Sequence, residues 1–97
     1  MSRTRNYHQE TLDVISRFYE VLDDLVKSKI ITINGFCVDN KIDKRHLYAQ
    51  KKDPSRGYFE TYWIVVLVKK YKVNSKFLLL GTGEMYVRRK LINVRVK

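Results

Sequence analysis

The segment from residue 32 to residue 52, TINGFCVDNKIDKRHLYAQKK, constrains the fold more than any other part of the chain. Thr32 and Asp43 are residue types that cap the N-terminus of a helix, because their side-chain oxygens accept hydrogen bonds from backbone amides of the first turn. The two caps predict a short helix that ends near Asn40 and a second helix over about 43–51, with a tight turn between them. The segment therefore has the sequence form of a helix-turn-helix.

The size and composition of the chain predict one small domain. With 97 residues and a hydrophobic fraction of 44%, the chain is long enough for a single modest core. Its longest apolar run, Trp63 to Val68, is far shorter than the roughly 18 residues of a membrane span. The basic start has no apolar segment behind it, so we expect no signal peptide. The lone Cys37 cannot form an intramolecular disulfide and suits a cytoplasmic location.

The positive charge of the chain is concentrated after the proposed turn. The total is +10, but residues 1–40 carry a net charge of −1 and residues 57–67 also carry −1. Residues 41–56 carry +4 and residues 68–97 carry +8. This asymmetry suggests a polyanionic partner, namely duplex DNA, RNA or an anionic membrane surface. Charge by itself does not choose among the three.

Three further helices are predicted outside this segment. From Glu10 to Lys29, apolar residues recur at spacings of three and four, which indicates an amphipathic helix with an acidic outer surface. A helix is also expected over about 58–71, where WIVVLV could pass for a strand but the flanking apolar spacing is helical. The run KFLLL predicts a last short helix, which is capped by Asn74 or Ser75 and ends at Gly81.

The remaining segments are expected to be irregular. Residues 1–9 form a flexible basic arm, and the Pro, Ser and Gly content of residues 53–57 indicates a loop. We expect the helix-turn-helix domain over 10–85 and a basic tail over 86–97. In that tail NVRVK alternates like a strand, although a disordered arm is equally allowed.

The apolar pattern of the motif follows a defined register. The motif has helix caps at Thr32 and Asp43 and a small residue at Cys37. Its larger apolar residues are Phe36, the β-branched Ile42, and Leu47. Cys37 must be small because the two helices cross closest there, and its three large apolar neighbours fill the space between them. Leu47 is the one strongly apolar residue of the second helix. The side chains left free to face outward are those of Lys44, Arg45, His46, Tyr48 and Ala49.

This register resembles the phage-repressor type of helix-turn-helix, the lambda-repressor-like or XRE family, whose usual form is close to T-Q-x-x-L-A-x-x-L-G-V-S-x-x-x-I. Many members end the domain with a form close to L-G-V-x-x-x-W-L-L-x-G-x-G-x-M, and residues 71–85 end in FLLLGTGEM. The resemblance covers roughly residues 11–85. It implies an all-α, compact five-helix DNA-binding domain.

Four positions depart from the family pattern. Ile33 stands where the family usually has a Gln that reaches the DNA backbone, and Asn40 replaces an apolar residue. Lys41 replaces the glycine of the turn, which implies either a left-handed non-glycine residue or a reshaped turn. Gly35 weakens the first helix.

The resemblance implies a set of DNA contacts for this chain. The second helix would lie in the major groove, with base contacts from Lys44, Arg45, Tyr48 and Ala49. His46 and Gln50 are additional candidates. Phosphate contacts are expected from Thr32 and its helix N-terminus, Lys51, Lys52 and Arg56. Each basic side chain has a rival interpretation as part of an ordinary solvated face, and Tyr48 could instead pack against the loop.

The sequence favours binding over catalysis. Neither His8 nor His46 has a neighbour at metal-ligand spacing, and Cys37 is expected in the core. Gly81-Thr82-Gly83 lacks the context of a phosphate loop. We therefore expect a sequence-specific double-stranded DNA-binding regulator that acts as a homodimer, without a cofactor or small-molecule ligand.

Two alternatives remain open. The first is a protein-interaction module, such as an antitoxin or a helix-turn-helix scaffold that does not read DNA. RNA binding is weaker, because no RNA-binding motif is visible.

Overall fold

A computed structural model of the chain describes residues 7–87, and this part of the molecule is an all-α globule. Five helices follow one another along the chain: α1 (Gln9–Lys27), α2 (Ile33–Asn40), α3 (Lys44–Lys52), α4 (Thr61–Tyr71) and α5 (Ser75–Leu80). The number and order of helices agree with the expectation from sequence. Among these residues no helix is both long and apolar enough to cross a membrane.

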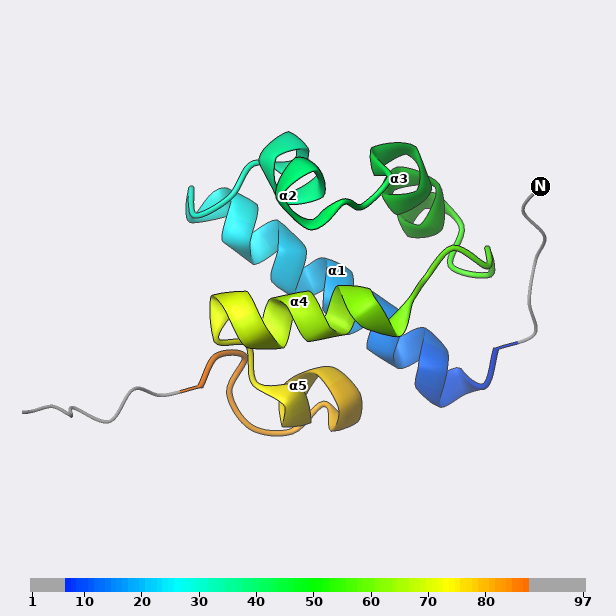
Figure 1. The fold of residues 1–97 in the computed structure, drawn as a ribbon. Coiled ribbons are helices and arrows are strands. Elements are labelled where there is room, and N and C mark those ends of the chain that lie inside the picture. The colour runs from blue at the N-terminus through cyan, green and yellow to red at the C-terminus, as the bar shows by residue number, and fades with distance from the viewer. Residues whose placement is uncertain (1–6, 88–97) are drawn as a thin grey trace, which may run out of the picture.

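The five helices pack around one core, and α4 runs across the middle of the molecule (Figure 1). In this view α2 and α3 lie on one side of α4, and α5 lies on the other. Aromatic side chains join α1 to α4, since the ring centroids of Phe18 and Trp63 are 5.7 Å apart. Phe18 is fully buried, and Phe36 from α2, Leu47 from α3 and Leu78 from α5 are at most 1% exposed. All five helices therefore contribute to a single core.

Short polar residues start three of the helices. The side chains of Thr32, Asp43 and Asn74 accept hydrogen bonds from the backbone amides of Gly35, Arg45 and Lys76. Each such bond satisfies an amide that has no partner inside its own helix. The predicted caps at Thr32 and Asp43 are confirmed, and Asn74 rather than Ser75 caps the last helix.

Left-handed residues end three of the helices. Gly81 ends α5 with φ of 75°, as expected. Lys41 ends α2 with φ of 56°, so the chain keeps the turn with a non-glycine residue rather than reshaping it. Lys72 ends α4 in the same way, with φ of 60°. The segment 63–68 is helical, which confirms that WIVVLV does not form a strand.

Two helix boundaries differ from the prediction by more than one residue. The first helix ends at Lys27 rather than Lys29, and α4 begins at Thr61 rather than Tyr58. The second difference arises at Glu60, the N-cap of α4, whose backbone is extended with φ of −126° and ψ of 147°. The backbone amides of Tyr58 and Phe59, which precede it, donate to the Oε1 atom of Gln50 at 2.9 and 3.0 Å.

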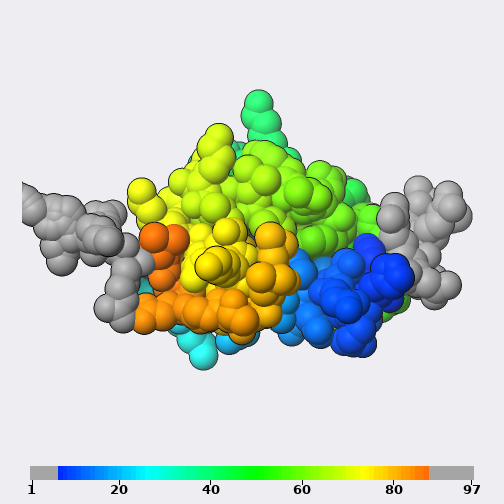
Figure 2. Space-filling view, turned by 90° about the horizontal axis from the view of Figure 1, so that it is seen from below, coloured from blue at the N-terminus to red at the C-terminus, as the bar shows by residue number. Residues whose placement is uncertain are grey.

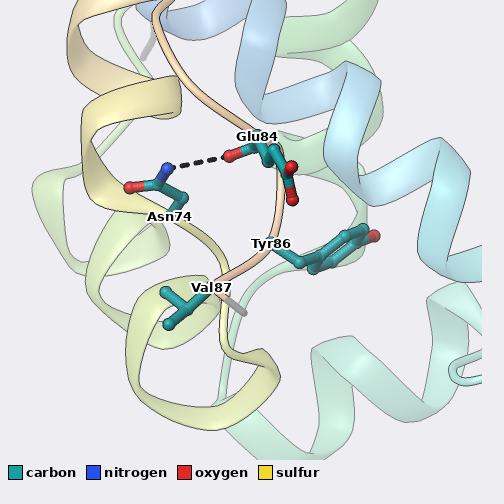
Figure 3. Close-up of a pocket in the computed structure, with 4 residues that line it drawn as sticks. All are labelled: Asn74, Glu84, Tyr86 and Val87. Carbon is teal, nitrogen blue, oxygen red and sulfur yellow. Dashed lines mark hydrogen bonds between the residues drawn. The ribbon is translucent and has the colours of Figure 1, made fainter. Parts of the chain in front are cut away.

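The chain after α5 folds back onto the end of α4. An antiparallel bridge pairs Val73 with Tyr86, and the amide of Val87 donates to the carbonyl of Lys72 at 2.8 Å. Figure 3 shows the side chain of Asn74 donating to the carbonyl of Glu84, at 2.8 Å, beside this bridge. Hydrogen bonding thus continues to Val87, and the rest of the predicted tail, 88–97, lies outside the described residues together with positions 1–6.

On the face opposite the helix-turn-helix, α5 and the segment 81–87 lie between α4 and the N-terminal part of α1 (Figure 2). Arg17 of α1 stabilises the end of α5. Its guanidinium donates to the carbonyl oxygens of Leu78 and Leu79, at 2.9 and 3.2 Å. Those oxygens belong to the last turn of a helix and have no partner within it.

Candidate nucleic-acid interface

Helix α3 has one buried side and one charged exposed side. Leu47 and Gln50 face the core, with 1% and 0% of their surface exposed. The exposed side carries Lys44, Arg45, Tyr48 and Lys52, whereas Ala49 is half-buried. Tyr48 is 52% exposed, so it does not pack into the loop. Three of the four predicted base-contacting side chains are thus presented to solvent on one short helix.

The N-terminus of α3 is held by Asp43. Its carboxylate accepts hydrogen bonds from the amides of Arg45 and His46, and the first of these bonds holds the pKa of the carboxyl below its ordinary value. The guanidinium of Arg45 lies 3.7 Å from the same carboxylate, but its side chain is 90% exposed. Exposed pairs of this kind are weak. Arg45 is therefore free to exchange this contact for another acceptor.

His46 is placed differently from the other residues of the exposed side. Its ring stacks on Tyr58, with centroids 4.0 Å apart and an angle of 10° between the planes. Its Nε2 atom lies 3.8 Å from the carboxylate of Asp43. To contact a DNA base, the ring of His46 would first have to leave its stack on Tyr58.

The N-terminus of α2 is accessible. Thr32 is exposed and caps the helix, so it could contact a phosphate. Ile33 is half-buried against the core, so its side chain supplies packing in place of the amide that the family pattern has there. The Nζ atom of Lys44 lies 3.4 Å from the Oδ1 atom of Asn34, which joins the exposed sides of the two motif helices.

The turn between α2 and α3 depends on Asn40, one of the departures from the family pattern. Asn40 is only 1% exposed, and its Nδ2 atom donates to the carbonyl of Phe36 at 2.8 Å. Its Oδ1 atom accepts from the Nζ atom of Lys70 at 2.6 Å, and its carbonyl accepts from the hydroxyl of Tyr62 at 3.1 Å. A polar side chain is tolerated here because the carbonyl of Phe36 and the ammonium group of Lys70 satisfy its amide group.

Two of the predicted phosphate contacts are engaged within the protein. The Nζ atom of Lys51 lies 3.1 Å from a carboxylate oxygen of Asp23 on α1. Arg56 lies 3.7 Å from the carboxylate of Asp53, and its carbonyl accepts from the hydroxyl of Tyr7. Lys52 is exposed and has no ion pair with another described residue. The three cations therefore differ in how readily they reach a phosphate.

Gln50 is not available as a base contact, which corrects its place among the additional candidates. Its side chain is fully buried. Its Oε1 atom accepts from two backbone amides, and its Nε2 atom donates to the carbonyl of Pro54 at 2.8 Å. A long polar side chain was needed inside because the loop after α3 carries amides and carbonyls that have no helical partner.

Cys37 lies in the core, as predicted from its place in the motif. It is 4% exposed, and burial raises the pKa of its thiol. This environment does not favour a reactive thiolate. Among residues 7–87, no group of three His, Cys, Asp or Glu side chains is arranged to hold a metal ion.

Comparison of the chain with family models, with curated proteins and with solved structures finds no match to any of the three.

Proposed function

We propose that the chain is a lambda-repressor-like helix-turn-helix protein that binds double-stranded DNA in a sequence-specific manner and regulates transcription. The single observation that carries this proposal is the division of α3 into a buried side and an exposed side with Lys44, Arg45 and Tyr48. In this class of domain the second helix of the motif enters the major groove and meets base edges.

The assignment of roles follows from exposure and bonding. Arg45 is the best candidate to pair with guanine O6 and N7, because its guanidinium is exposed and offers two parallel donors. Lys44 and Tyr48 border it, and Ala49 offers an apolar contact for a thymine methyl group. Thr32 and Lys52 would position the backbone, while Lys51 and Arg56 would have to exchange their carboxylate partners for phosphates.

A homodimer on a two-fold site follows from the small size of the reading surface. One short helix contacts only a few base pairs, and such domains gain affinity by pairing two reading helices on one face of the duplex. Duplexes selected from a random pool should therefore contain two related half-sites about one helical turn apart. A single half-site would contradict the dimer but not DNA binding.

The decisive test replaces Lys44 and Arg45 by Ala together. We expect roughly a tenfold or greater loss of affinity for the selected duplex, with relaxed preference over random duplex. The matched control is Lys69→Ala with Lys76→Ala, which removes the same charge from α4 and α5. If both double variants lost affinity equally at several salt concentrations, α3 would not be the reading helix.

The alternative function is a protein-interaction module, such as an antitoxin. The ion pair of Lys51 with Asp23 and the apolar packing of Ile33 favour it, because both reduce the contacts that the family pattern makes with phosphates. Absence of duplex binding at low salt, in a protein that remains folded, would support this alternative.

A further inference from the structure

A second surface lies at the end of the molecule away from α3. It is a hollow with a volume of about 370 Å³, between the C-terminal ends of α1 and α4. In Figure 1 these two helix ends lie on the left, whereas α3 lies on the right. The proposed DNA-reading helix therefore takes no part in this hollow.

The floor of the hollow is apolar. Leu25, Ile30, Tyr71 and Tyr86 line it, and they come from α1, the loop after α1, the end of α4 and the returning C-terminal segment. Leu25 belongs to the core, but Ile30 is 61% exposed in spite of its apolar side chain. Burial of such a side chain against a partner would be favourable, because apolar surface leaves water.

The rim of the hollow is positively charged. Lys70 and Lys72 line it, and Lys29 stands between two residues that also line it, Ser28 and Ile30. Among residues 7–87 none of these three lysines forms an ion pair, and the one recorded partner of Lys70 is the neutral amide of Asn40.

One acidic side chain, Asp24, also lines the hollow, but its carboxylate already accepts a hydrogen bond within the protein. The hydroxyl of Tyr86 donates to its Oδ2 atom at 2.7 Å. The charge of the side chains that line the hollow is therefore positive, because Lys70 and Lys72 outweigh Asp24.

We propose that this hollow, between the C-terminal ends of α1 and α4, docks an acidic segment of a partner protein through one apolar side chain. Carboxylates on either side of that side chain would face the lysines of the rim. Ligand pockets commonly measure about 300–1,000 Å³, so a hollow of this size takes one bulky side chain rather than a broad surface. Nucleic acid is a poorer occupant, since phosphates gain nothing from an apolar floor.

The test uses the full chain and a capped synthetic peptide of acidic residues around one central phenylalanine. We expect saturable binding in fluorescence anisotropy, with amide chemical-shift changes centred on Ser28, Ile30, Tyr71 and Lys72. Replacing the phenylalanine of the peptide by serine should weaken binding roughly tenfold or more, because the apolar anchor is lost. Equal binding of the two peptides would overturn the proposal.

Two variants localise the effect. Lys72→Glu keeps a non-glycine residue in the left-handed conformation and should weaken peptide binding about five- to tenfold by reversing a rim charge. Lys52→Glu makes the same charge change on α3 and should alter it less than about twofold. Ile30→Ser should weaken the phenylalanine peptide but not the serine peptide.

The proposal would be overturned by shift changes centred on α3, by equal effects of the two Lys→Glu variants, or by a short DNA duplex that maps to the hollow. Because no DNA is present in the peptide measurement, its outcome is independent of the proposed DNA-binding function.

Discussion

The hydroxyl of Tyr19 donates a hydrogen bond of 2.7 Å to the carbonyl oxygen of Leu47, and this bond fastens α3 to α1 from inside the protein. Tyr19 is 7% exposed, so water competes little for the bond. Because Leu47 lies on the buried side of α3, the orientation of the exposed side is set by a residue 28 positions earlier in the sequence. Helix α1 therefore helps to hold α3 in its orientation, although α1 itself contacts no DNA in the proposed function.

Tyr19→Phe should lower the free energy of unfolding by about 1 kcal/mol, the usual net contribution of one hydrogen bond. The measurement is urea unfolding at pH 7. Tyr48→Phe serves as the matched control, because the hydroxyl of Tyr48, on the exposed side of α3, forms no hydrogen bond with another residue of 7–87. Its effect should stay within about 0.5 kcal/mol. Equal effects of the two substitutions would show that the bond to Leu47 contributes nothing.

The same bond predicts a loss of stability at high pH. Burial, followed by the charge of Cys37, raises the pKa of the Tyr19 hydroxyl above its ordinary value of 10. Above that pH the unfolded chain loses this proton while the folded protein keeps it, so the free energy of unfolding falls as the pH rises. Between pH 9 and pH 11 the wild type should lose about 1 kcal/mol more than Tyr19→Phe. An equal loss of stability in the two proteins would contradict a raised pKa of the Tyr19 hydroxyl.

Gln50 is expected to be essential for the loop that follows α3. Gln50→Leu has a similar size but removes the acceptor for the amides of Tyr58 and Phe59 and the donor for Pro54. We expect a loss of about 2–4 kcal/mol, because buried amides would lack partners, and faster hydrogen exchange at those two amides. Gln9→Leu, at an exposed glutamine on α1, is the control and should change stability by less than about 0.5 kcal/mol. Unchanged exchange at Tyr58 and Phe59 would refute this role.

Gln50 also shows which features of the fold could not be predicted from the sequence. Capping residues and apolar spacing predicted five helices in the right order, because these signals act within a few residues of each other. Polar side chains are ordinarily expected outside, so nothing local predicted that Gln50 and Asn40 are buried. Their partners come from the loop after α3 and from α4, and such pairings appear only when the chain is folded.

The departure at Asn40 leads to a prediction about coupling between the turn and α4. Asn40→Ala should cost about 1–3 kcal/mol, and Lys70→Met should cost less because Lys70 is exposed. In the double variant the two losses should fall short of additivity by about 0.5–1.5 kcal/mol, as for residues in contact. Asn34→Ala, at an exposed asparagine of the same helix, is the control. Strict additivity of the Asn40 and Lys70 changes would mean that their contact is not energetically significant.

The ion pair of Lys51 with Asp23 yields the sharpest prediction about DNA binding. Asp23 lies on the acidic side of α1 and holds the Nζ atom of Lys51 at 3.1 Å. Asp23→Asn should release this lysine for a phosphate and raise duplex affinity about two- to fivefold at low salt, with a steeper dependence on salt concentration. In a Lys51→Ala background the same change should have a smaller effect, because the released cation is absent.

Glu20→Gln provides the control for net charge, since it removes one exposed carboxylate from the same helix. A general electrostatic effect would make Glu20→Gln and Asp23→Asn equal, and it would persist without Lys51. A specific contact requires that the gain from Asp23→Asn exceeds the gain from Glu20→Gln only while Lys51 is present. Fluorescence anisotropy on one selected duplex, at three salt concentrations, distinguishes the two cases, and equal gains would remove Lys51 from the set of phosphate contacts.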